Sequence, residues 1–260
     1  MTGRRVVPRV AKGAAAGLGL LAVANALPAL SSIAPMRNRM LPGLAGTGDP
    51  GHVALTFDDG PDPKSTPLFL DLLDKRGVKA TFFLLGFMLE RAPGLGREIA
   101  AAGHEIALHG YTHRVMLARG PLSTRDDITR GHHLVAEVTG VEPRWYRPPY
   151  GVLTTAARVT ASRLGMRTVL WTTWGRDWTD TASPDSVQCL VQRDLRGGGT
   201  ILLHDSDCTS KPEAWRSTLG AVPRLLDTME ERGWRVGPLR EHGLAVPGRS
   251  TGPLAPGAAA

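Results

Sequence analysis

The sequence predicts an α/β fold in which a parallel sheet curves into an incomplete barrel. First, apolar runs with strand character alternate with amphipathic helical segments over residues 52–239, and this alternation is typical of βαβ units. Second, short polar clusters follow the strand segments: DDG, HGYTH, RPPYG, GRDW and HD. In α/β barrels, chemistry takes place at the carboxyl ends of the strands. Six or seven strand segments are too few for a complete eight-stranded barrel.

The first half of the chain begins with the apolar run VALTF, which predicts a strand that ends at the Asp58-Asp59-Gly60 turn. Helical periodicity and β-rich apolar runs then alternate, and Gly77 and Gly103 mark helix ends. The pattern predicts helices over 67–75, 89–102 and 123–139, and strands over 78–86 and 104–110.

The second half continues in the same way. Residues 145–151 indicate a turn-rich strand end, and residues 166–174 read as one buried strand. Ser183 is a typical N-cap residue, followed by Pro184 in the first helical turn. The remaining segments predict helices over 154–164, 183–195 and 213–232, a strand over 200–205 and a closing segment over 234–239.

The basic charge belongs to the N-terminus. Residues 1–40 hold six Lys and Arg and no acid, so the rest of the chain contributes only one of the seven net charges. A nucleic-acid partner is therefore not expected. Cations followed by the apolar residues 13–34 are typical of an export signal, with Ala24-Asn25-Ala26 as a cleavage site. We expect a monomer that is exported, either secreted or anchored at the extracellular face, with membrane contact only through this segment.

The predicted organisation has four parts. They are a signal peptide or membrane anchor over 1–35, a linker over 36–51, a catalytic domain over 52–244 and a disordered tail over 245–260. Cys189 and Cys208 either form one disulfide, as suits an exported chain, or are two buried free thiols.

Three residues form a candidate metal site. His109 and His113 are spaced i, i+4, which allows two imidazoles to bind one ion. Asp59 lies at another strand end and would be the third ligand. Two histidines and one carboxylate leave a position open for water, as in catalytic zinc sites.

The neighbouring carboxylate, Asp58, needs its own counter-charge, and Arg147 is the candidate. Held in this way, Asp58 would act as the general base on the attacking water. His204 would protonate the leaving group, and Asp177 would orient its imidazole. Asp205 is the competing partner for His204.

The motifs TFDDGP, HGYTH, RPPYG, RDW and LLH, in this order, resemble the five motifs of the polysaccharide deacetylases, carbohydrate esterase family 4. The resemblance covers about residues 50–240 and implies a distorted (β/α)7 barrel. It also implies a divalent metal, usually Zn²⁺, although Co²⁺ or another ion is possible, and hydrolysis of acetyl groups on a glycan such as chitin, peptidoglycan or xylan. By position, it assigns Asp58 as base, His204 as acid, and Arg147 and Asp177 as their partners.

The same resemblance gives the metal to Asp59, His109 and His113. It lets Tyr150 stabilise the oxyanion through its backbone N–H and lets Trp178 and Leu202 line the acetyl pocket. One position departs from the family pattern: Gly110 stands where Ser or Thr is usual. The hydroxyl that would steady this loop is missing, and Thr112 is the candidate substitute.

Other histidines and tryptophans lack such spacing. We interpret His52, His104, His132 and His133 as structural or surface residues, and most tryptophans as core or rim residues. Two further functions stay open: a non-catalytic glycan-binding homologue, and a metal-dependent deacylase of another amide or an O-acetyl ester.

Overall fold

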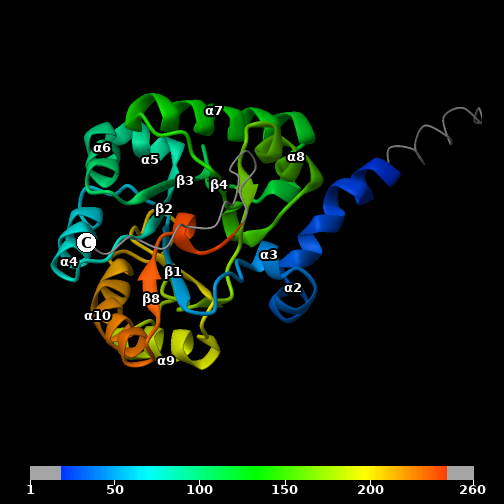
Figure 1. The fold of residues 1–260 in the computed structure, drawn as a ribbon. Coiled ribbons are helices and arrows are strands. Elements are labelled where there is room, and N and C mark those ends of the chain that lie inside the picture. The colour runs from blue at the N-terminus through cyan, green and yellow to red at the C-terminus, as the bar shows by residue number, and fades with distance from the viewer. Residues whose placement is uncertain (1–18, 245–260) are drawn as a thin grey trace, which may run out of the picture.

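The computed structural model describes residues 19–244 and contains one parallel sheet wrapped into a partial barrel (Figure 1). Seven strands follow the path β5-β4-β3-β2-β1-β7-β6, and β8 pairs with the start of β1. The distorted (β/α)7 fold predicted from the sequence is therefore confirmed. The strands are β1 (His52–Asp58), β2 (Thr81–Leu85), β3 (Glu105–Gly110), β4 (Trp145–Tyr146), β5 (Arg167–Thr168), β6 (Thr173–Trp174), β7 (Thr200–His204) and β8 (Arg235–Gly237).

The register brings the polar strand ends to one level. Asp58, the last residue of β1, pairs with His204 at the end of β7 and with Phe83 of β2. Below this rim the inside of the barrel is filled by a small apolar cluster that includes Phe83, Trp145 and Val169. The barrel is thus a packed core with its polar groups at one end, as in other α/β barrels.

Helices cover the outside of the sheet (Figure 1). The larger core cluster lies between their apolar faces and the outer face of the strands. The helices are α4 (Thr66–Lys75), α5 (Gly86–Arg91), α6 (Pro93–Ala101), α7 (Pro121–Thr139), α8 (Thr155–Arg163), α9 (Pro184–Asp194) and α10 (Trp215–Glu231). Ser183 caps α9 by accepting a hydrogen bond from the Ser186 N–H, as its position predicted.

One of the predicted helices is two separate helices in the structure. Residues 89–102 read as a single helix, but α5 ends at Arg91 and α6 begins at Pro93. Ala92 between them has φ −136° and ψ 59°. A residue that precedes proline is excluded from helical geometry by contact with the proline ring, so the prediction missed the break that Pro93 enforces.

The predicted strand 166–174 is also wrong. Its two ends form β5 and β6, which pair with β4 and β7 at the two opposite ends of the sheet. The barrel is open between β5 and β6, and residues 169–172 cross this opening. We call the opening, with the residues that cross it, the seam. Apolar periodicity cannot reveal this, because a buried strand and a buried crossing segment contain the same residue types.

The segment predicted as a linker is folded against the seam. Residues 34–45 form α2 (Ala34–Met40) and α3 (Pro42–Ala45), after the short 3-10 helix η1 (Leu27–Ser32). Arg37 is buried and donates hydrogen bonds to the carbonyl oxygens of Ser31, at 3.0 Å, and Trp171, at 2.8 Å. The Leu170 N–H donates to the Leu44 carbonyl at 2.7 Å. These contacts satisfy seam backbone groups that have no strand partner, as buried peptide groups require.

We expect Arg37→Met to destabilise the protein by about 2–4 kcal/mol, because two carbonyls lose a charged donor in a buried place. Arg39→Met is the matched control, since Arg39 is exposed on the same helix and its loss should change stability by less than about 0.5 kcal/mol. Urea unfolding of the two variants measures the difference. Equal midpoints would show that α2 merely rests on the seam.

In the part of the chain that the structure describes, no single helix is long and apolar enough to cross a bilayer. Residues 19–32 together with α2 meet the length and composition test only as a pair bent by 93°. The first half of the predicted export segment and the predicted tail 245–260 lie outside the described residues.

Candidate active site

Asp58 and Asp59 both face the rim although they are neighbours at the end of a strand. Successive strand residues point to opposite faces, but Asp59 has a φ of 77° and so leaves the strand geometry. Aspartate tolerates this left-handed region better than most residues. Both carboxylates are buried, with exposed fractions of 2% each, so each needs a compensating partner.

The partner of Asp58 is Arg147, which is fully buried. Its Nη1 donates to Asp58 Oδ1 at 2.6 Å and to Thr56 Oγ1 at 2.8 Å. Its Nη2 donates to the Leu170 carbonyl at 2.9 Å, and the guanidinium lies 3.9 Å from the centre of the Phe83 ring. The arginine is held from several sides, so it fixes the Asp58 carboxylate in one orientation.

The two histidines direct their Nε2 atoms toward Asp59. His109 Nδ1 lies 2.7 Å from the Arg147 carbonyl oxygen, which can only accept a hydrogen bond. The proton of neutral His109 therefore sits on Nδ1, and Nε2 is left as a lone pair. Burial lowers the pKa of His113 to about 4, against the charge of Asp59, so this imidazole is neutral at pH 7.

A metal ion fits between these groups. Asp59 Oδ1 lies 3.4 Å from His109 Nε2 and 3.3 Å from His113 Nε2. The same oxygen is buried and has no hydrogen-bond partner in the structure, which is costly unless something else binds it. Burial raises the pKa of Asp59, but the charge of His204, those of His113 and His109 when they are protonated in acid, and the Thr209 hydrogen bond outweigh it, so the net shift of the pKa is downward. One carboxylate and two imidazoles are a typical ligand set for zinc.

Sequence reasoning missed one residue that positions Asp59. Thr209, in the loop after β7, donates its hydroxyl to Asp59 Oδ2 at 2.6 Å. This bond occupies one carboxylate oxygen and leaves Oδ1 for the ion. Cys208 next to it donates its Sγ–H to the Asp59 carbonyl at 3.5 Å.

His204 is oriented by Asp177. His204 Nδ1 lies 2.9 Å from Asp177 Oδ1, while Asp177 Oδ2 accepts from the His204 N–H at 2.7 Å and from Thr218 Oγ1 at 2.6 Å. The competing partner, Asp205, instead accepts from the Thr66 hydroxyl. Burial lowers the pKa of His204, but the charge and hydrogen bond of Asp177, with the charges of Asp59 and Asp58, raise it to about 10.

This shift predicts a pH dependence of stability in metal-free protein. The folded pKa lies above the unfolded value of about 6.5, so the stabilisation is complete below pH 6.5 and is lost as the pH rises through about 10. We expect wild type to lose unfolding free energy relative to His204→Gln over this interval. Urea titrations between pH 6 and 10 measure it, and parallel curves for the two proteins would contradict it.

The three residues proposed to contact substrate lie around the same rim. Trp178 packs edge-on to His204, with ring centres 5.4 Å apart, and Tyr150 packs edge-on to His113 at 4.5 Å. Tyr150 is 56% exposed, whereas Leu202 is buried in a cluster with Leu170 and Trp171. The rim therefore has one apolar wall beside His204 and one aromatic ring above the metal ligands.

The loop that carries His113 is held by Asp127, a residue that no motif or spacing singles out. From α7, this carboxylate accepts from the Tyr111 N–H at 3.1 Å, from the Thr112 hydroxyl at 2.6 Å and from Arg119 at 2.6 Å. Thr112 thus supplies a hydroxyl that steadies the loop, as predicted. Gly110 has a φ of 110°, which side-chain-bearing residues rarely adopt, so serine or threonine in this backbone conformation would be strained.

The remaining predictions concern residues outside the site. Cys189 and Cys208 are both free and Cys189 is exposed, so the predicted disulfide is absent from the structure and the thiols are not both buried. His52 hydrogen-bonds to His242 at the start of β1, and His104 accepts from the Ala80 N–H. These histidines therefore have structural contacts.

The comparisons with known proteins bear on this site. The polysaccharide deacetylase family profile matches residues 45–169. A peptidoglycan-N-acetylglucosamine deacetylase of Bacillus cereus is 35% identical over 185 residues, which cover 70% of this chain and 84% of the relative. The chain belongs to the polysaccharide deacetylases of carbohydrate esterase family 4.

Two further members of this family show that it contains both a named deacetylase and a pseudoenzyme. A chitooligosaccharide deacetylase of a Bradyrhizobium species is 33% identical over 198 residues, covering 72% of this chain and 88% of the relative. A solved structure from Bacillus anthracis is described as a pseudoenzyme of the family; it matches with a TM-score of 0.67 and 28% identity, over 74% of this chain and 65% of that one. Family membership therefore supports deacetylation of a glycan, but activity depends on the site residues of each member.

Proposed function

We propose that the protein is an exported, metal-dependent hydrolase that removes acetyl groups from N-acetylated sugars of a wall glycan, either peptidoglycan or a chitin-type polymer. The supporting observation is the buried Oδ1 of Asp59, which has no hydrogen-bond partner and faces the Nε2 atoms of two imidazoles, beside a second carboxylate fixed by Arg147. An inert ion-pair cluster would not leave this oxygen without a hydrogen bond.

Asp59, His109 and His113 would hold the metal, with Zn²⁺ as the best match to the ligand set. A bound ion would supply Lewis-acid activation of the water and of the acetyl carbonyl. The ligands suit this task because Asp59 is ionised and His113 is neutral at pH 7.

The protein's own residues divide the proton transfers. Asp58, held by Arg147, accepts the proton of the water that attacks the acetyl carbon. His204, protonated and oriented by Asp177, donates a proton to the amide nitrogen, so that the C–N bond breaks to give acetate and a free amine. The backbone N–H of Tyr150 would stabilise the developing oxyanion, and Trp178 and Leu202 would hold the acetyl methyl group.

Export is part of the same proposal, since a wall glycan lies outside the membrane. The cations and apolar residues of segment 1–35 support it.

Acetate release by the purified full-length protein tests the proposal. The panel contains N-acetylated chitooligosaccharides, peptidoglycan, O-acetylated xylan and small N-acetyl amides, each with added zinc and with a chelator. We expect release from one of the first two, loss on chelation and recovery with zinc. Metal binding without release from any substrate would indicate a non-catalytic homologue, and preference for small amides or xylan would reassign the substrate.

A further inference from the structure

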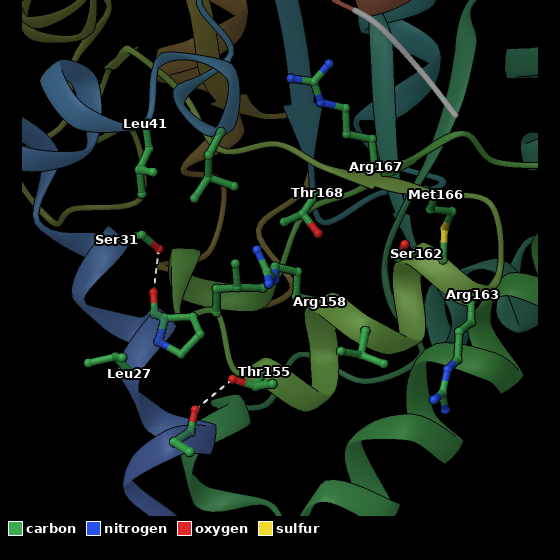
Figure 2. Close-up of a pocket in the computed structure, with 15 residues that line it drawn as sticks. Leu27, Ser31, Leu41, Thr155, Arg158, Ser162, Arg163, Met166, Arg167 and Thr168 are labelled. Atoms are coloured by element: carbon green, nitrogen blue, oxygen red, sulfur yellow. Dashed lines mark hydrogen bonds between the residues drawn. The ribbon is translucent and has the colours of Figure 1, made fainter. Parts of the chain in front are cut away.

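A groove separates the N-terminal helical segment from α8, away from the metal ligands. Its volume is about 880 Å³. The floor is apolar, with Leu27, Leu41, Leu153 and Val159 among the residues that line it. Figure 2 shows Arg158 reaching from α8 toward the N-terminal helix, with Arg163 farther along α8.

The charged side chains that line the groove are all basic. Three arginines, Arg158, Arg163 and Arg167, contribute to it, and among the described residues around the groove there is no Asp or Glu. Within the described chain, the side chains of Arg158 and Arg163 make no hydrogen bond or ion pair, whereas the Arg158 backbone N–H donates to the Thr154 carbonyl oxygen. An apolar groove with unpaired cations fits an amphiphile with an anionic head group.

Large apolar side chains stand exposed on the helical segment beside the groove. Leu20 and Leu21 are 73% and 69% exposed, and Met40 is 69% exposed. Leu27, Leu30 and Ile33 lie between them and are more than half exposed. Several large exposed apolar side chains along one segment are typical of an interaction site. In Figure 1 this segment projects from the α8 side of the barrel, opposite α6.

We propose that this face, formed by residues 20–41 and α8, docks on a bilayer that contains anionic phospholipid. The exposed leucines enter the interface, while Arg158 and Arg163 meet lipid phosphates at the groove, as arginines and apolar side chains do on interfacial helices. Charge complementarity selects the lipid: each basic residue near an anionic leaflet strengthens binding about fivefold. The inference rests on the proposed export of the chain in its anchored form, with the N-terminal segment retained, but not on its deacetylase activity.

Vesicle flotation of the full-length protein tests this docking. Vesicles of phosphatidylcholine alone are compared with vesicles that also contain about one third phosphatidylglycerol. We expect the exposed apolar side chains of the N-terminal segment to bind both kinds of vesicle. The readout is therefore the ratio of the two partition coefficients. We expect wild type to prefer the anionic vesicles and Arg158→Gln/Arg163→Gln to lose about 25-fold of that preference, two factors of about five.

The matched control is Arg91→Gln/Arg97→Gln, which removes two exposed arginines from α5 and α6, on the opposite side of the barrel (Figure 1). It should keep the wild-type ratio. The proposal is overturned if both double variants behave alike, or if wild type shows no preference for anionic vesicles. It is also overturned if inorganic phosphate competes more strongly than sodium chloride of equal ionic strength, which would indicate a soluble-anion site.

A soluble chitooligosaccharide assay on the same proteins separates this result from the proposed function. Both double variants should deacetylate at the wild-type rate. If none of the proteins is active while the lipid preference follows Arg158 and Arg163, the proposed function fails and the docking stands.

Discussion

Asp58→Asn and Asp59→Asn should fail in different ways. Asparagine at position 58 still accepts the hydrogen bond from Arg147, so the ligand set Asp59, His109 and His113 keeps its metal. The deacetylation rate should nevertheless fall by about 10²–10⁴, because the base is gone. Asp59→Asn removes the anionic ligand, so metal affinity itself should fall and excess zinc should restore part of the activity.

Metal content by mass spectrometry and acetate release measure the two effects. The matched control is Asp62→Asn, in the same turn, because Asp62 accepts from the Lys64 N–H and lies outside the ligand set. It should keep both metal and rate. If Asp58→Asn loses the metal and Asp59→Asn keeps it, the two roles are reversed.

Arg147→Met should produce the largest loss of stability. Arg147 is fully buried and Asp58 is 2% exposed, so the substitution leaves a buried carboxylate without its counter-charge. Removing one partner of such a pair costs about 3–5 kcal/mol. Arg130→Met removes an arginine that pairs with Glu90 where the side chains are 60% and 43% exposed, and it should cost less than about 1 kcal/mol.

The double variant Asp58→Asn/Arg147→Met isolates the cause. If the cost comes from the uncompensated carboxylate, the double variant should recover part of the stability that Arg147→Met loses. Urea unfolding of the metal-free proteins measures the stability of wild type, Arg147→Met, Arg130→Met and the double variant. A double variant at least as unstable as Arg147→Met would mean that Arg147 acts through its bonds to Thr56 and Leu170 instead.

The candidate site was largely predictable because its chemistry lies in short motifs at strand ends. His109 lies near the end of β3 and His113 in the loop that follows it, and parallel pairing aligns Asp58 with His204, so local patterns and the sheet rule bring these residues together. The same reasoning favoured Asp177 as the partner of His204 but kept Asp205 as a competitor, because both lie near the relevant strand end; the structure shows Asp177 paired with His204, while Asp205 accepts from Thr66.

Features that depend on distant contacts were not predictable. Thr209 and Asp127 carry no periodic or motif signal: Thr209 acts through one hydrogen bond to Asp59, and Asp127 through several hydrogen bonds to the His113 loop. Residues 166–174 were predicted to form one strand because the apolar residues that cross the seam would suit a strand equally well. The composition of residues 36–51 suggested a linker. Nothing in a Pro- and Gly-rich run reveals that Arg37 is buried and donates a hydrogen bond to the Trp171 carbonyl oxygen.

The bond from Arg37 to Trp171 also sets an order of assembly. The two residues are 134 positions apart, and a chain is synthesised from its N-terminus. The segment that is made first therefore has no surface to bind until residues 169–172 have been made and β5 and β6 have formed on either side of them. Contacts this far apart carry a high loop-closure entropy and form late. Arg37 should thus report a late step of folding, with little effect on the folding rate and a faster unfolding rate when it is replaced.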